Sequence, residues 1–375
     1  MNRQVSLVLV DSSGDVLGRL PPLPVDMPWW QEVGEVDDRY QVLRLLYGDR
    51  SAPPGGHVTY LAETEAAPPH RLTPGTVDLT PHERRAPYAE IGGPGRSMEW
   101  ARQVVGARVT LRQQRTWNLS AIWRVDGTDG SPVAWLKQVP KFFAHEPVAI
   151  QEVARVAPGL VPPLMATGDE GRMLLEHVPG RDCYGAGVEL REAVATAFHE
   201  VQQHFAGHPL AQGVVPQGRR DFAAVADPHV GEIDGLGQLI DGLEQRLADV
   251  EACGVPLTLV HGDLHPGNVR VDGDGRLTIM DWGDSTIDHP AFDILRLTEG
   301  LAEPVPMLEA WAARWKRTSP GSEPLRALEL LRPVAALRAA ATFAAFLEAI
   351  EPAEHPYHAQ DVVGMLRVAA SMVTS

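Results

Sequence analysis

The sequence predicts an α+β fold in which a strand-rich first half precedes a helical second half. Up to about residue 180, short apolar runs such as 57–62 and 133–137 are bounded by Gly- and Pro-rich turns, which is typical of strands. From residue 190 onward, apolar side chains recur at steps of three and four, the period of a helix. Because hydrophobic residues make up 44% of the 375 residues, the chain can bury a sizeable core.

Composition restricts the partners and the compartment. The formal net charge is −16, whereas a nucleic-acid-binding face needs a basic surface. The negative charge suits a soluble protein and would also attract a cationic substrate. Cys183 and Cys253 provide neither a disulfide framework nor metal-ligand spacing, which indicates a reducing compartment. Because neither a signal peptide nor a run of 18 apolar residues is found, we expect a cytoplasmic protein that does not enter a membrane.

Residues 1–96 are expected to form a separate small α/β domain that ends in an irregular, Pro-rich linker. A short helix is predicted to begin near Trp29, and the Pro-rich run 21–28 is not expected to form a regular strand. Strands are predicted over residues 5–10, 15–20, 41–47 and 57–62. These strands resemble the start of a Nudix-like domain, but the Nudix metal box is missing, so we expect no hydrolase activity from them.

The most informative pattern begins at His261-Gly-Asp-Leu-His-Pro-Gly-Asn268 and ends at Asp281-Trp-Gly283. Phosphoryl transfer needs one carboxylate to orient the attacking hydroxyl and further oxygen atoms to hold magnesium. Asp263 and Asn268 lie five residues apart on a loop with Pro and Gly between them, which allows a tight turn. Two short strands joined by a Gly-rich turn then lead to Asp281. Protein kinases use an Asp, an Asn and a second Asp in the same order.

This pattern resembles the aminoglycoside phosphotransferase and choline kinase-like family. Gly stands where protein kinases have the Arg of H-R-D, and Trp stands where they have the Phe of D-F-G. The resemblance covers about residues 107–375. It implies a protein-kinase-like two-lobe fold, with a small lobe over residues 97–178 and a helical lobe over residues 179–375. Asp263 would be the catalytic residue, and Asn268 and Asp281 would bind Mg²⁺.

A second motif predicts the contact with the nucleotide phosphates. Val133-Ala-Trp-Leu-Lys137 is close to the V-A-I-K pattern, whose Lys pairs with the α- and β-phosphates. That Lys needs a carboxylate on the helix predicted over residues 144–156. Glu146 is favoured and Glu152 is the alternative.

The resemblance also implies the remaining nucleotide contacts. A hairpin loop over residues 114–119, which contains Trp117 and Asn118, would cover the phosphates together with Ser120 at the start of the next strand. The loop lacks the Gly-x-Gly-x-x-Gly of protein kinases. The backbone of Glu176 and Val178 would bind adenine.

Several further helices are predicted. Ser97 is a candidate N-cap for a helix over residues 98–105. In the second half, helices are expected over residues 190–206, 236–251 and 325–350, the last with a kink or a break at Pro333. In the resembling family, the Asp at the position of Asp293 begins a helix and steadies the catalytic loop. Glu348, Glu351 and Glu354 could meet ammonium groups, but a solvated face is the simpler interpretation.

We interpret the chain as a phosphotransferase that requires Mg²⁺ and uses ATP or GTP. The acceptor would be a hydroxyl of a sugar, an amino sugar, an aminoglycoside-like antibiotic or an amino alcohol. The alternative is a non-catalytic, nucleotide-binding regulatory protein. Because every catalytic position of the pattern is filled, we favour the enzyme.

Overall fold

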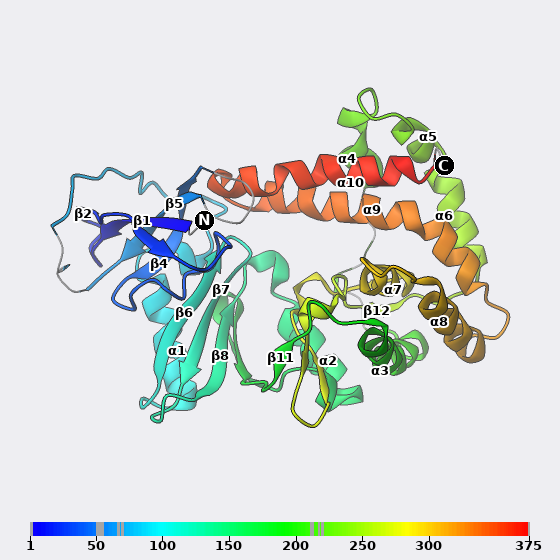
Figure 1. Ribbon diagram of the computed structural model, residues 1–375, viewed down its shortest axis with the longest axis horizontal. Helices are drawn as coiled ribbons and strands as arrows, with labels where there is room; N and C mark the ends of the chain where they lie inside the picture. The colour runs from blue at the N-terminus through cyan, green and yellow to red at the C-terminus, as the bar shows by residue number, and fades with distance from the viewer. Residues whose placement is uncertain are drawn as a thin grey trace. The chain divides into compact units, whose positions relative to one another are not determined.

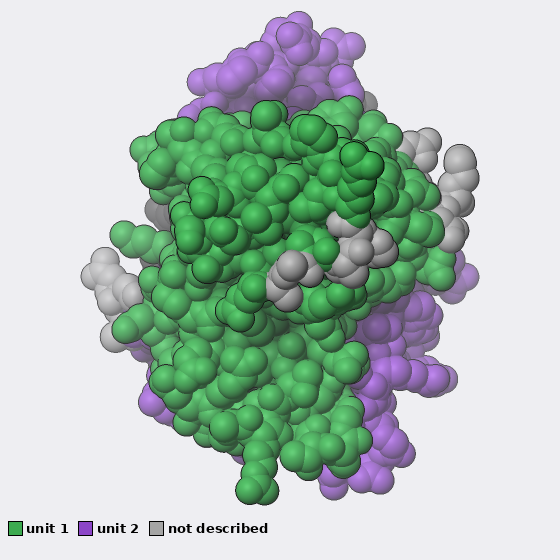
Figure 2. Space-filling model, turned by 90° about the vertical axis from the view of Figure 1, so that its left-hand side faces the viewer, with its two compact units in different colours: residues 1–144, 164–177, 346–358 green, residues 145–163, 178–345, 359–375 purple. Residues whose placement is uncertain are grey.

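The computed structural model describes residues 3–49, 56–65, 68, 71–210, 214–216, 218 and 221–373. The chain forms two compact units, each assembled from separate segments (Figure 2). Unit 1 contains residues 1–144, 164–177 and 346–358, and unit 2 contains residues 145–163, 178–345 and 359–375. Unit 1 therefore includes a segment from near the C-terminus.

The first sheet of unit 1 has the order β2-β1-β5-β4, and β3 also pairs with β1 (Figure 1). Its strands are β1 (Arg3–Val10), β2 (Val16–Arg19), β3 (Leu23–Val25), β4 (Gln41–Gly48) and β5 (His57–Glu63). β1 runs parallel to β5, and the other pairs are antiparallel. Leu7 and Leu9 are buried on one face, and Val8 and Val10 on the other. Burial on both faces explains why residues 7–10 of β1 are a continuous apolar run instead of an alternating one.

Two local predictions in this region are wrong. The segment after Trp29 forms successive turns, in which Val36 N–H donates to the carbonyl of Val33, and not a helix. Its apolar residues still reach the core, because Trp30 is only 8% exposed. Residues 23–25 form the short strand β3 in spite of Pro24, which lies opposite Gln4 of β1. A Pro is tolerated there because β3 pairs with a single neighbour.

The second sheet of unit 1 is antiparallel, with the order β6-β7-β8-β10-β9. Its strands are β6 (Thr110–Trp117), β7 (Ser120–Asp126), β8 (Pro132–Gln138), β9 (Leu164–Gly168) and β10 (Arg172–Glu176). Ala101 of helix α1 (Gly93–Val105) shares a buried cluster with Trp123 and Leu136 of this sheet. α1 begins at Gly93, not at Met98. Ser97 therefore lies inside the helix, where its hydroxyl donates to the carbonyl of Gly93.

Unit 2 is mainly helical. Its helices are α2 (Glu146–Val156), α3 (Val188–Gly207), α4 (Phe222–Ala226), α5 (Leu236–Asp241), α6 (Leu243–Ala252), α7 (Ala291–Thr298), α8 (Val305–Thr318), α10 (Ala359–Ser371) and most of α9 (Pro324–Ala349). Two small sheets accompany them. One joins β11 (Arg181–Asp182), β13 (Val269–Val271) and β14 (Leu277–Ile279), and the other joins β12 (Thr258–Val260) and β15 (Thr286–Asp288).

Two helix predictions in unit 2 need correction. The helix expected over residues 236–251 is divided at Gly242 into α5 and α6, because Gly is a poor helix former. α9 continues through Pro333, which excludes a break there, while the kink that was the alternative stays a prediction. Among the described residues, α9 is also the one helix long and apolar enough to cross a membrane, but the core helix of a soluble protein passes the same test. Leu331, Val334 and Leu337 of α9 are indeed buried.

Candidate active site

The catalytic-loop sequence follows β12 and begins with a fully buried histidine. His261 Nε2 lies 2.9 Å from the carbonyl oxygen of Met280, and Nδ1 accepts from the Asp263 N–H at 3.3 Å. This pattern assigns the proton to Nε2, which donates to Met280. Burial lowers the pKa of His261, so the ring is neutral. His261 therefore connects the loop to the end of β14 without adding a charge.

Asp293, in the first turn of α7, holds the start of the loop. Its two carboxylate oxygens accept from the backbone N–H groups of His261 and Gly262, each at 3.0 Å, and Gln202 donates to it at 2.9 Å. Burial raises the pKa of Asp293 to about 7, although the two backbone donors act in the opposite direction. The side chain predicted to steady the loop thus contacts its backbone directly.

Asp263 is the predicted catalytic residue, and its carboxylate has three neighbours. Arg296 Nε donates to Oδ1 at 2.7 Å, while Asn268 Nδ2 and His265 Nε2 lie 3.3 and 3.5 Å from Oδ2. Burial alone would raise the pKa of Asp263, but the contacts with His265 and Arg296 outweigh it, and the pKa lies well below its usual range. The carboxylate is therefore ionised at neutral pH, as a group that accepts a proton must be.

Asn268 is oriented by the same loop. It ends the short helical turn η6 (Pro266–Asn268), and its Nδ2 donates to the backbone carbonyl of Asp263 at 3.0 Å. The amide nitrogen is thereby directed at Asp263, which leaves Oδ1 as the atom suited to a cation.

Asp281 adopts a backbone conformation that is unusual for its residue type. Its φ is +62°, a left-handed value that only Glu170 shares among the non-glycine residues described. The preceding residue, Met280, donates its N–H to the carbonyl of Asn268 at 2.7 Å, so Asp281 follows directly on a contact with the other predicted metal ligand. Backbone strain of this kind costs on the order of 1–3 kcal/mol and is concentrated at functional sites.

The residue after Asp281 links this turn to α2. Trp282 N–H donates to Glu146 Oε1 at 3.2 Å, and the Trp282 ring is fully buried beside His261 at 4.7 Å. Glu146 itself is 1% exposed. Glu152, the alternative partner for Lys137, instead forms an ion pair with the exposed Arg155.

The predicted ligands are chemically suited to Mg²⁺. Carboxylate and amide oxygens are hard ligands, and Mg²⁺ usually takes one or two protein groups together with water and phosphate oxygens. Asp281 and the Oδ1 atom of Asn268 fit such a partial set. Within the described part of the chain, no group of three or more His, Cys, Asp or Glu side chains is arranged to hold a metal by itself.

In unit 1, the predicted nucleotide residues lie on the second sheet. Lys137 is near the end of β8, is 8% exposed and is paired in register with Met173 of β10. Glu176 ends β10, and the following His177 N–H donates to the carbonyl of Val133 at 3.0 Å. Val178, the other predicted adenine contact, is the first residue of the next unit 2 segment. The roles of all three residues stay predictions.

The predicted phosphate-covering loop is shorter than expected, because β6 extends to Trp117. Trp117 Nε1 donates to the hydroxyl of Ser120 at 2.9 Å. The Asn118 N–H donates to both carboxylate oxygens of Glu354, each at 3.0 Å, and Asn118 Oδ1 accepts from the Glu351 N–H at 3.4 Å. In unit 1 the hairpin turn is therefore held by the C-terminal segment 346–358. A role in nucleotide binding for Trp117, Asn118 and Ser120 stays a prediction.

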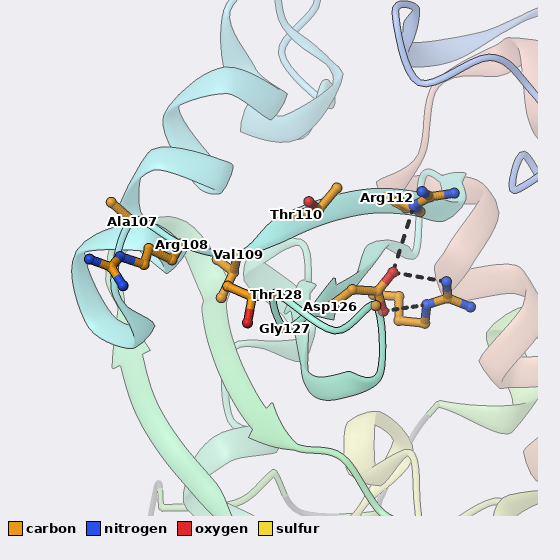
Figure 3. A pocket seen from close by; sticks show the side chains of 10 residues that line it. Ala107, Arg108, Val109, Thr110, Arg112, Asp126, Gly127 and Thr128 are labelled. Carbon is orange, nitrogen blue, oxygen red and sulfur yellow. Dashed lines mark hydrogen bonds and ion pairs between the residues drawn. The ribbon is translucent and has the colours of Figure 1, made fainter.

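An open hollow of about 570 Å³ lies at the opposite end of the same hairpin (Figure 3). There, Arg124 donates to both oxygens of Asp126 at 2.8 and 2.9 Å. None of the predicted site residues lines this hollow, so we do not assign the active site to it.

Sequence reasoning missed two residues that touch the predicted site. Arg296 has no motif of its own, and its contact with Asp263 depends on how α7 packs against the loop. Glu354 was interpreted as a solvated face, but it is 1% exposed and contacts a residue 236 positions away. The position of Arg296 three residues after Asp293, on the same helix face, is the one signal that could have suggested its contact.

The chain was compared with protein families, with known sequences and with solved structures. Residues 139–330 match the family described as "Phosphotransferase enzyme family" (APH). The uncharacterized protein YcbJ of Bacillus subtilis is 26% identical over 123 residues, which are 32% of this chain and 39% of that relative. The chain thus spans well under half of that relative's length.

Two solved structures share the fold. Choline kinase LicA of Streptococcus pneumoniae has a TM-score of 0.50 at 14% identity, over 74% of this chain and 99% of that chain. Choline kinase of Cryptosporidium parvum has a TM-score of 0.51 at 12% identity, over 75% and 96%. These similarities confirm the expected α+β, protein-kinase-like fold. Since the family match spans just over half of the residues, the chain belongs to the phosphotransferase enzyme family.

Proposed function

We propose that this phosphotransferase transfers the γ-phosphoryl group of ATP, or of GTP, to a hydroxyl group of a small polar molecule. Sugars, amino sugars, aminoglycoside-like antibiotics and amino alcohols are the acceptor classes that the sequence suggests. The observation that carries the proposal is the double contact of Asp293 with the His261 and Gly262 amides, which fixes the loop that bears an ionised Asp263. We also propose that the enzyme works in the cytoplasm.

Asp263, Asn268 and Asp281 have different roles in this reaction. Asp263 orients the acceptor hydroxyl, whose oxygen attacks the γ-phosphorus as the bond to the leaving nucleoside diphosphate breaks. The hydroxyl proton passes to Asp263. Because the transition state is loose, this transfer comes late, and a carboxylate with a low pKa suffices. Asn268 and Asp281 would hold Mg²⁺, which neutralises charge on the phosphates.

The remaining roles concern the nucleotide. Lys137 binds the α- and β-phosphates, and Glu146 is its carboxylate partner on α2. Burial of Glu146 supports this choice over Glu152. The backbone of Glu176 and Val178 binds adenine, and the turn with Trp117, Asn118 and Ser120 covers the phosphates. Residues 1–96 are proposed to be a domain that precedes the two kinase lobes, 97–178 and 179–375.

Substitution of the catalytic carboxylate tests the proposal. Asp263→Asn keeps the shape of the side chain but cannot accept the proton, so we expect turnover to fall by at least about a hundredfold. Nucleotide affinity should change little, because Asp263 contacts the acceptor. Release of nucleoside diphosphate and binding of a fluorescent ATP analogue measure the two quantities. Asp274→Asn, in the exposed turn between β13 and β14, is the matched control. Equal turnover in Asp263→Asn and wild type would refute the role.

A further inference from the structure

A positive charge lies directly against the proposed catalytic carboxylate. Arg296 Nε is 2.7 Å from Asp263 Oδ1, and its Nη1 forms an ion pair with Glu299. The side chains of Arg296 and Asp263 are each 37% exposed, so a dissolved acceptor can reach both. A hydroxyl that approaches Asp263 therefore arrives beside a guanidinium group, which keeps its charge at every physiological pH.

The position of Arg296 is fixed by a helix that is held at both ends. Asp293 joins the first turn of α7 to the loop. At the last turn, Arg191 Nη1 donates to the carbonyls of Leu297, within α7, and Glu299, directly after it, at 2.7 and 2.8 Å. Arg296 lies between these two anchors. Its contact with Asp263 thus comes from packed secondary structure and not from a mobile surface side chain alone.

We propose that Arg296 makes the enzyme prefer an acceptor that carries a carboxylate or a phosphate close to the hydroxyl to be phosphorylated. This inference rests on the proposed function. Arg296 already occupies Asp263 Oδ1, whereas the neighbours of Oδ2 lie at longer distances of 3.3 and 3.5 Å. The hydroxyl donates to Oδ2, and the anionic group of the acceptor binds the terminal nitrogens of Arg296.

The guanidinium group is suited to this second contact. Its planar edge binds carboxylates and phosphates through two parallel hydrogen bonds. Among the described residues, Nη2 of Arg296 has no hydrogen bond, and Nη1 is paired with Glu299, which is 61% exposed. An acceptor anion can therefore replace an exposed carboxylate at Nη1 and engage Nη2 without breaking the bond to Asp263.

The same charge disfavours cationic acceptors. An ammonium group beside the reacting hydroxyl would lie next to Arg296, and the negative charge of Asp263 that could attract it is already paired. The overall charge of −16 does not decide this local preference, because salt screens exposed charges beyond about 10 Å. Within the acceptor classes suggested by the sequence, amino alcohols and aminoglycosides are therefore disfavoured.

Matched acceptors on one carbon skeleton test the preference. Glycerol 3-phosphate, glycerate, glycerol and 3-amino-1,2-propanediol form one series, and glucose 6-phosphate, glucuronate, glucose and glucosamine form another. With ATP and Mg²⁺, we expect kcat/KM for an anionic member to exceed that for the amine by about tenfold or more. Comparison of kcat/KM between the phosphate-bearing and the carboxylate-bearing member of each series shows which anion is preferred.

Substitutions of Arg296 test whether this side chain causes the preference for anionic acceptors. Arg296→Met should raise KM for the anionic acceptor by about tenfold, with a smaller effect on the neutral one, and Arg296→Lys should restore part of the difference. Arg326→Met, which removes an exposed Arg paired with Glu323 three residues away, is the matched control. Thermal melting verifies that each variant is folded.

Each outcome separates this inference from the function on which it rests. Preferred turnover of the amines, or an equal loss on all acceptors in Arg296→Met, would overturn the role of Arg296 but leave a phosphotransferase. Absence of turnover on both series would count against the inference. If Asp263→Asn also matched wild type in nucleotide hydrolysis, the proposed function would fall as well.

Discussion

Gly262 shows how a single residue decides whether the catalytic loop can form. Its φ is +87°, and a Cβ atom placed there would lie 2.1 Å from the carbonyl oxygen of Asp284. Both the left-handed conformation and the close approach of the backbone therefore require glycine. The sequence motif includes this Gly, but the motif alone does not reveal that the neighbouring backbone comes from beyond Asp281.

We predict that Gly262→Ala lowers the free energy of unfolding by about 2–4 kcal/mol, because it combines a strained φ with a clash against backbone. Urea denaturation of the purified protein measures the change. Gly273→Ala, in the turn between β13 and β14, has no neighbour within 4 Å of the added Cβ and should stay within about 0.5 kcal/mol of wild type. Equal effects of the two substitutions would contradict the argument.

Asp281 provides a second prediction at this scale. Asn tolerates the left-handed conformation at least as well as Asp, but it removes the negative charge. Asp281→Asn should therefore keep the melting temperature within a few degrees of wild type while the Mg²⁺ concentration needed for half-maximal turnover rises about tenfold or more. Titration of Mg²⁺ at saturating ATP measures this. An unchanged Mg²⁺ requirement would exclude Asp281 as a ligand.

At the scale of elements, local sequence predicted most strands but few of the contacts between distant segments. β1, β4, β5 and β8 lie within two residues of their predicted bounds, because each combines apolar runs with clear turn signals. Successive turns replaced the helix expected after Trp29, since Val33 N–H donates to the carbonyl of Gln114 on β6. Propensity is a weak guide where such tertiary contacts determine the backbone.

The short helix η8 (Pro352–Tyr357) shows the same limit. It brings Glu354 to the Asn118 amide, and the neighbouring Glu351 forms an ion pair with Arg85 at 3.0 Å. Burial raises the pKa of Glu354 to about 8, from an ordinary value of 4.5. No sequence pattern predicts this carboxyl group as buried, because its partner lies on a hairpin far earlier in the chain.

Glu354 contributes one part of the pH dependence of stability. Since folding raises its pKa, the stability it contributes is complete below about pH 4.5 and is lost as the pH rises through 8. Glu354→Gln can still accept from Asn118, so we expect it to remove about 2–4 kcal/mol of the decline in unfolding free energy between pH 5 and pH 8.5. Denaturant melts across this range measure the difference. Parallel pH curves for the variant and wild type would contradict the assignment.

At the scale of the whole molecule, the sequence predicted the kinase-like fold but not the way segments combine into unit 1. Gln113 of β6 donates to the carbonyl of Val42 of β4 and accepts from its N–H, both at 2.8 Å. Tyr357 stacks on Trp30 with ring centroids 4.3 Å apart. Both sheets and the C-terminal segment 346–358 therefore share one packed unit, which no local pattern indicates.

This packing predicts that removal of residues 1–85 destabilises the rest of unit 1. A chain that begins at residue 86 would lose the partners of Trp117 and Tyr357, which pack against the core of the first sheet. We expect its melting temperature to fall by at least about 5 °C and its binding of a hydrophobic dye to increase. Calorimetry and dye fluorescence measure both effects. An unchanged melting temperature would show that residues 1–85 fold and act independently.

The inclusion of residues 346–358 in unit 1 also affects when the chain can fold during its synthesis on the ribosome. A nascent chain emerges from its N-terminus, and N-terminal domains generally fold first. Here the opening sheets cannot acquire their final contacts with Tyr357 and Glu354 until residues 178–345 of unit 2 have been synthesised. At about 5–20 residues per second, roughly 9 to 36 seconds separate the synthesis of Glu176, the last residue of β10, from that of Tyr357. Unit 1 therefore completes its packing only after most of unit 2 has been synthesised.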